Sequence, residues 1–167
     1  TAFIADEFGD DKIPVEPVED WELACLSLLH YLIGRDMARS QALGVGDSLL
    51  NFSTMKSAYS SFRLAIGDDG FEAKIRSLNA GQYQIEIANH SYSLRLVDYS
   101  DGKASLEVDG VRVTVLFYFE ASEVHASLDG RIRRCLNILA NASTSQEGVS
   151  TGKITAPMHG RIVELFV

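Results

Sequence analysis

The pattern of apolar and polar positions changes near residue 60 and divides the chain into a helical part and a β-rich part. From Trp21 to about Arg39 the residues are good helix formers without proline. Apolar side chains in this segment form two stripes about 100° apart on a helix. The first stripe is Trp21, Ala24, Leu28 and Leu32, and the second is Leu26, Leu29, Ile33 and Met37. A helix that is apolar on more than one side is normally surrounded by other structure, so we expect this helix to be buried.

After residue 60 the apolar positions alternate with polar ones, which predicts β-strands. Short turn signals separate them, among them Asn89-His90, Asp109-Gly110 and Asp129-Gly130. Eight short strands joined by tight turns favour an antiparallel meander. The predicted strands cover residues 61–66, 71–77, 82–88, 92–98, 103–108, 111–119, 123–128 and 131–138.

A meander of this size has two unpaired edges unless it closes, and its apolar face needs a cover. We therefore predict an α+β fold in which a long central helix is enclosed by an eight-stranded antiparallel up-and-down β-barrel, with flexible flanking segments. The alternative is a hollow barrel that carries a small ligand, with the helix outside. The inward residues are expected to be Ile85, Ile87, Leu94, Leu96, Leu106, Val113, Val115 and Leu136.

Residues 42–59, between the predicted helix and the first strand, form a long segment rich in Gly, Ser, Asp and Asn. Loops of this length are usually functional or disordered, and large apolar groups argue against disorder. We interpret these groups as a contact surface for a partner. The surface residues are Leu49, Leu50, Phe52, Met55 and Tyr59.

Composition and charge exclude several classes of protein. The net charge is −8, from 15 basic and 23 acidic residues, which disfavours a nucleic-acid partner. The apolar run Trp21–Ile33 is too short to span a bilayer. The first residues have neither a basic n-region nor an apolar h-region, so we expect a cytoplasmic or mitochondrial-matrix protein, with the cytoplasm preferred. Cys25 and Cys135 are expected to be buried free thiols.

The ionisable residues form no pattern typical of a catalytic or metal site. His30 is interpreted as a hydrogen-bonded core or barrel-rim residue, while His90 in a predicted turn and His125 on a strand have no metal-ligand spacing. The carboxylates of Asp68 and Asp69 fit a solvated turn, and Asp20 is expected to cap the helix. The basic cluster is explained either by protection of a strand edge or by a salt-bridging patch for an acidic partner. This cluster consists of Arg131, Arg133 and Arg134.

The end of the chain resembles the opening of biotin carboxyl carrier domains, in which an Ala-Pro-Met-x-Gly turn joins the first strands. The matching residues are Ala156, Pro157, Met158 and Gly160, whereas His159 replaces the usual proline. The resemblance implies that the biotin-bearing lysine lies beyond Val167, so that no biotin is held by the present residues.

The order of the segments is similar to the region between the biotin carboxylase and carrier domains in α subunits of propionyl-CoA, methylcrotonyl-CoA and geranyl-CoA carboxylases. In that family the region is called the BT domain, a non-catalytic helix-in-barrel module. It docks the α subunit onto the carboxyltransferase β subunit, partly through a loop called the hook. The resemblance implies a parent ligase that is oligomeric and uses biotin, ATP and Mg²⁺. It also implies a division into the end of the carboxylase region and a linker (1–19), the BT domain (20–139, hook 42–59), a second linker (140–152) and a truncated carrier domain (153–167).

Overall fold

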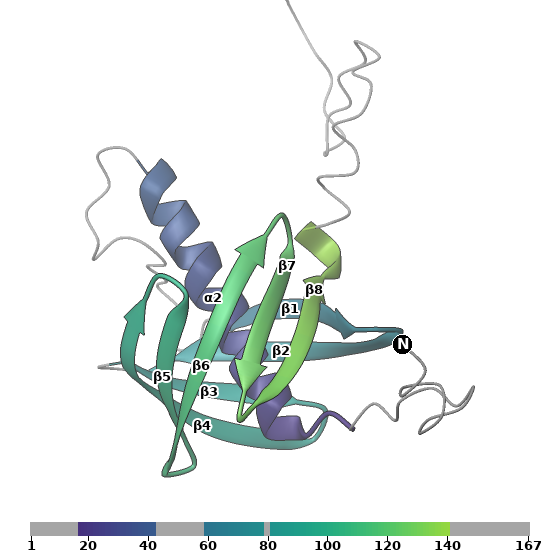
Figure 1. The fold of residues 1–167 in the computed structure, drawn as a ribbon. Helices are drawn as coiled ribbons and strands as arrows, with labels where there is room; N and C mark the ends of the chain where they lie inside the picture. The colour runs from purple at the N-terminus through teal and green to yellow at the C-terminus, as the bar shows by residue number, and fades with distance from the viewer. Residues whose placement is uncertain (1–16, 43–58, 79–80, 141–167) are drawn as a thin grey trace, which may run out of the picture.

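The computed structural model describes residues 17–42, 59–78 and 81–140. Helix α2 covers Asp20–Gln41, and the strands follow it in the order of the sequence (Figure 1). The bounds agree with the predicted segments to within two residues at every end. The strands are β1 (Ser60–Ile66), β2 (Asp69–Ser77), β3 (Gln82–Ile87), β4 (His90–Ser100), β5 (Lys103–Val108), β6 (Val111–Glu120), β7 (Glu123–Leu128) and β8 (Arg131–Asn137).

The eight strands form a closed antiparallel barrel in which each strand pairs with its neighbours in sequence. The barrel closes between β1 and β8, where Leu64 lies opposite Asn137 and Ala65 opposite Leu136. Closure removes the free edges that an open meander would expose. The predicted eight-stranded antiparallel barrel following an N-terminal helix is therefore confirmed.

Tight turns with positive φ set the register of several hairpins. At Asp109-Gly110 φ is 47° and 89°, and at Asp129-Gly130 it is 48° and 80°. Positive φ at both central positions matches the twist of the flanking strands and favours Asp-Gly. The turn predicted at Asn89-His90 lies one residue earlier, because Ala88 has φ 51° and His90 begins β4.

Alternate residues of each strand point into one apolar core. Of the expected inward residues, Ile85, Ile87, Leu94, Leu106 and Val115 are buried, and Leu96 and Val113 are partly buried against the same cluster. The prediction for Leu136 is wrong. The pairing of Leu64 with Asn137 turns the odd-numbered residues of β8 inward, so Cys135 occupies the core position.

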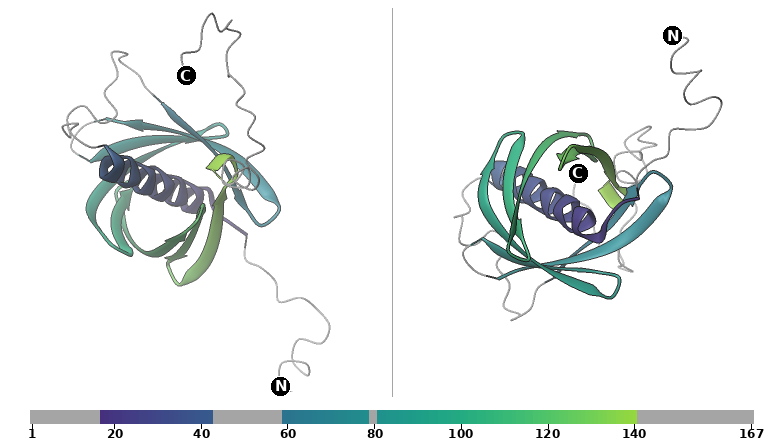
Figure 2. Two further views of the ribbon diagram at one scale, coloured as in Figure 1. Left: turned by 90° about the horizontal axis from the view of Figure 1, so that it is seen from above. Right: turned by 60° about the horizontal axis from the view of Figure 1, so that its bottom comes forward.

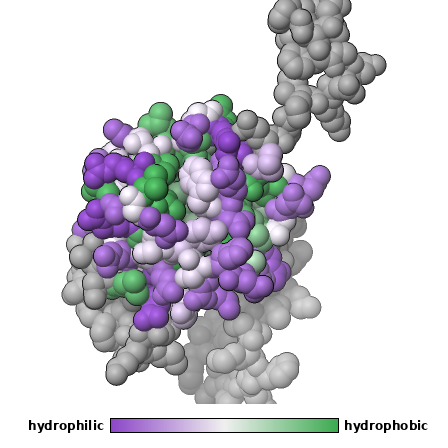
Figure 3. Space-filling view, turned by 90° about the horizontal axis from the view of Figure 1, so that it is seen from below, coloured by the Kyte–Doolittle hydropathy of each residue, from purple (hydrophilic) through white to green (hydrophobic). Residues whose placement is uncertain are grey.

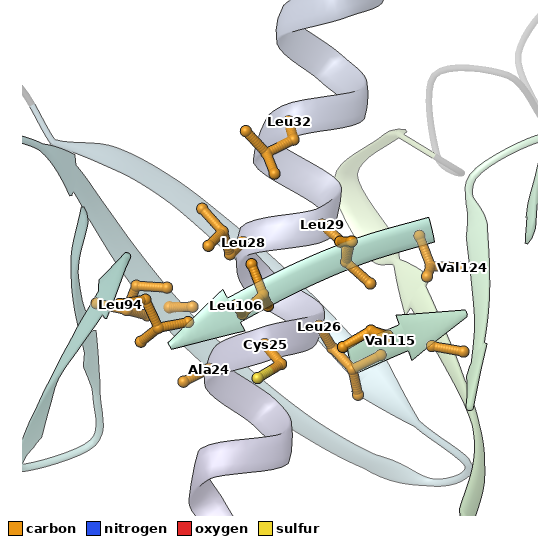
Figure 4. Packing of buried hydrophobic residues seen from close by; sticks show 14 of the residues in the cluster. Ala24, Cys25, Leu26, Leu28, Leu29, Leu32, Leu94, Leu106, Val115 and Val124 are labelled. Carbon is orange, nitrogen blue, oxygen red and sulfur yellow. The ribbon is translucent and has the colours of Figure 1, made fainter. Parts of the chain in front are cut away.

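The core also contains α2, which packs against β1, β2, β3, β4 and β7 (Figure 2). Side chains from both predicted stripes have 0% exposure, and they lie on different sides of the helix (Figure 4). Burial of both stripes is confirmed between Ala24 and Ile33, whereas Met37 is 46% exposed. The fully buried helix residues are Ala24, Cys25, Leu26, Leu28, Leu29 and Leu32, together with Glu22 and Ser27.

The helix begins one residue earlier than predicted. Glu19 is the N-cap, and its carbonyl accepts hydrogen bonds from the amides of Glu22 (2.9 Å) and Leu23 (3.2 Å). The Glu22 carboxylate in turn accepts from the Glu19 amide at 2.8 Å. Asp20 is therefore the first helical residue rather than the cap, and its carboxylate is available to the barrel.

Candidate functional site

His30 is a structural residue of the core. It is 5% exposed, and its Nε2 donates to the carbonyl of Cys135 at 3.0 Å, because a carbonyl can only accept. Its ring lies edge-on to Phe119, with centroids 6.5 Å apart. Burial lowers the pKa of the His30 imidazole, and the bond to the Cys135 carbonyl opposes this shift only in part. The prediction of a hydrogen-bonded core histidine is confirmed.

This burial predicts that stability falls on mild acidification. Because the folded pKa of His30 lies below its ordinary value of 6.5, the unfolded state binds the proton first. The contribution of His30 to the free energy of unfolding should therefore be complete above pH 6.5 and be lost as the pH falls from there toward the lowered pKa. Urea titrations between about pH 5 and 8 check this. His30→Gln retains a donor for the Cys135 carbonyl and should reduce the change of the free energy of unfolding between these pH values. An unchanged pH dependence in this variant would exclude His30 as its cause.

The other two described histidines lie at the surface. Nδ1 of His90 is 3.1 Å from Oδ2 of Asp20, and the Tyr92 hydroxyl donates to the same carboxylate oxygen at 3.4 Å. Nε2 of His125 is 3.4 Å from a carboxylate oxygen of Glu123. Within the described ranges no group of three or more His, Cys, Asp or Glu side chains could hold a metal ion.

The three clustered arginines each form an ion pair with a carboxylate of this chain. Arg131 pairs with Glu19 at 2.8 Å and Arg134 with Glu123 at 3.0 Å. Arg133 pairs with Glu22 inside the protein, where their side chains are 6% and 0% exposed. Protection of a free strand edge is the wrong explanation, since β8 has a paired strand on both sides. Arg131 and Arg133 therefore connect the helix start to β8, whereas Arg134 connects β8 to β7; a role of this cluster toward an acidic partner stays a prediction.

Both cysteines are free and buried, as predicted. Burial raises the pKa of the Cys25 thiol to about 12 and that of the Cys135 thiol to about 12, with smaller contributions from Glu22 and Glu123 respectively. Thiols react as thiolates, so neither group is suited to nucleophilic or redox chemistry in the folded protein.

Most of the partner-contact residues predicted from the sequence lie outside the described residues, as does the predicted carrier turn. Tyr59, at the border of the described part, is 40% exposed. Its hydroxyl donates to Glu86 at 3.4 Å, and the guanidinium of Arg76 lies 5.9 Å from its ring centroid. The outside residues are Leu49, Leu50, Phe52 and Met55 of the loop, and Ala156, Pro157, Met158 and Gly160 of the turn.

Sequence reasoning missed a cleft beside the C-terminal half of α2. Its volume is about 840 Å³, and it lies between the helix, the β4–β5 turn and β6. Apolar groups dominate the described lining, and the charged groups that line it are carboxylates. The residues that define it are Ile33, Met37, Tyr99, Phe117, Asp36 and Asp101.

One wall of this cleft is a pair of stacked rings. Tyr99 and Phe117 have centroids 5.9 Å apart and an interplanar angle of 8°. Burial raises the pKa of Tyr99 to about 12, and the neighbouring Asp36 carboxylate, which accepts a hydrogen bond from the phenol, contributes to the shift. The phenol is therefore neutral and bonded to Asp36, while the ring stacks on Phe117.

Seen from the side on which α2 begins, the surface is mainly hydrophilic, with apolar residues in small separate groups (Figure 3). In the part of the chain that the structure describes, no helix has the length and apolar character to cross a membrane.

Comparison of the chain with protein-family models and with curated proteins found no match.

Proposed function

We propose that this chain is a non-catalytic docking module from the α subunit of a biotin-dependent acyl-CoA carboxylase, and that it binds the carboxyltransferase β subunit. In this proposal α2 is enclosed by the barrel and forms a rigid stem. The parent enzyme would use biotin, ATP and Mg²⁺ in its neighbouring domains, with the biotinyl lysine beyond Val167.

The observation that carries the proposal is the core that α2 shares with the strands. Helix residues with 0% exposure share one core cluster with the inward residues of the strands. A carrier of small ligands needs open space inside its barrel for the ligand. The packing therefore supports a scaffold over the alternative of a hollow ligand-binding barrel.

The chemistry of the described residues points the same way. Every buried side-chain nitrogen and oxygen that the structure describes has a hydrogen-bond partner within the protein, so no unsatisfied polar group among them points to a substrate. His30, Glu22 and Arg133 are buried, but each bonds to another group of the protein. A module of this kind can act by presenting a surface, and the apolar residues between α2 and β1 in the sequence offer one.

Co-elution with the purified carboxyltransferase subunit in size-exclusion chromatography tests the proposal. The chain should elute with the subunit, and the double variant Leu50→Asp/Phe52→Asp should not, because charges replace two apolar anchors. Asn51→Asp, between the two positions, provides the matched control and should retain binding. Absence of co-elution for the unaltered chain would contradict the docking function, and unchanged binding of the double variant would remove this loop from the interface.

A further inference from the structure

The charged groups near the two ends of α2 are paired differently. At its start, acidic side chains bond to groups of the barrel: Glu19 to Arg131 (2.8 Å), Asp20 to His90 (3.1 Å) and Glu22 to Arg133 (3.0 Å). At the other end Asp101, in the exposed turn between β4 and β5, makes no ion pair among the described residues. The first end is bonded internally, while the second retains an acceptor at the mouth of the cleft.

The cleft at this second end exposes an apolar side chain of the helix. Met37 lines it and is 46% exposed. The stacked rings of Tyr99 and Phe117, which also line the cleft, provide a flat wall. Methionine adapts its shape to different partners, and rigid aromatic rings give contact area at low entropic cost. These features are typical of a surface that receives side chains of another protein.

The charges of the lining restrict what the occupant can be. Asp36 is already engaged, since it accepts from Arg35 at 3.1 Å and from the Tyr99 phenol. Asp101 is not engaged in this way, and no lysine, arginine or histidine is found among the described lining residues. A cation beside an apolar group complements this arrangement, whereas an acidic segment would meet repulsion.

We propose that this cleft receives an apolar side chain of the partner subunit, with an adjacent lysine or arginine that pairs with Asp101. The inference rests on the proposed docking function and adds to it a second contact site and the chemistry of the partner segment. Apolar anchors seated in pockets tend to dominate binding energy, while rim charges govern association rate and salt dependence.

The test measures the affinity of the chain for the carboxyltransferase subunit by isothermal titration calorimetry. Met37→Glu should weaken binding by about tenfold or more, because it places a carboxylate among apolar groups in the cleft that Asp101 also lines. Asp101→Arg should weaken binding and reduce its dependence on salt. Asp68→Arg makes the same charge change in the exposed β1–β2 turn and should bind as the unaltered chain does.

The possible outcomes separate the two proposals. If the unaltered chain binds but both cleft variants bind equally well, the cleft is not a contact site, while the docking function stands. If the unaltered chain does not bind the subunit, the docking function and the cleft proposal fall together. Thermal unfolding of each variant, followed by circular dichroism, confirms that it is folded.

If a charged variant fails to fold, a labelling experiment tests whether the cleft contacts the partner subunit. Because Cys25 and Cys135 are buried with raised pKa values, Met37→Cys introduces a reactive thiol against an unreactive background. The carboxyltransferase subunit should slow labelling of this thiol by about tenfold or more. Labelling of Asp68→Cys should be unaffected. An unchanged rate at position 37 in the presence of bound subunit would overturn the proposal.

Discussion

Replacing Glu22 by glutamine is expected to lower the free energy of unfolding by about 3–5 kcal/mol, since it breaks a buried ion pair. The Glu22 carboxylate accepts from Nε and Nη2 of Arg133 at 3.2 Å and 3.0 Å. Its side chain is 0% exposed and that of Arg133 is 6% exposed, so the guanidinium would stay charged and buried after losing its paired carboxylate, while its bond to the Pro17 carbonyl (3.1 Å) remains. Urea denaturation followed by circular dichroism measures the loss.

A surface pair provides the matched control. Glu123 bonds to Arg134 with the same bidentate geometry, at 3.1 Å and 3.0 Å, but Arg134 is 68% exposed. Solvent-exposed pairs contribute at most about 1 kcal/mol, so Glu123→Gln should have a small effect. Equal losses from Glu22→Gln and Glu123→Gln would contradict the account. Replacing Glu22 and Arg133 together by methionine should recover much of the stability, because no charge is then left buried.

Leu28→Ala and Leu29→Ala are each expected to destabilise the protein by about 2–5 kcal/mol. The two leucines lie on different sides of α2, and both have 0% exposure (Figure 4). A helix lying on the outer surface of a barrel would lose stability at one of these positions and tolerate alanine at the other. Met37→Ala, at a position that is 46% exposed, is the control and should cost far less. Chemical denaturation of the three variants compares these effects.

The barrel could be predicted from the sequence because the signals that specify its strands and turns are local. Alternation in segments such as Tyr83–Ile87 defines one apolar face, and Asp-Gly turns mark the hairpins. The same rule fails in β8, where Cys135 and Leu136 are adjacent apolar residues and either could point inward. Pairing across the closure of the barrel decides between them, and that pairing is not local.

The contacts that shape the candidate site are too far apart in the sequence for pattern reasoning. Glu22 and Arg133 are separated by 111 positions, so a clustered group of arginines gave no sign that one of them is buried. The cleft likewise combines Met37 of α2, Tyr99 of β4 and Phe117 of β6. Each of these residues alone fits an ordinary amphipathic element, and only the closed barrel brings them together.

Hydrogen–deuterium exchange of the chain, alone and with the carboxyltransferase subunit, tests the docking function most directly. Binding is predicted to slow exchange at the C-terminal end of α2, around 36–41, and in the β4–β5 turn, around 100–103. Exchange at the opposite end, in the Asp129-Gly130 turn, should not change. Identical exchange with and without the subunit, or protection confined to the Asp129-Gly130 end, would contradict the account.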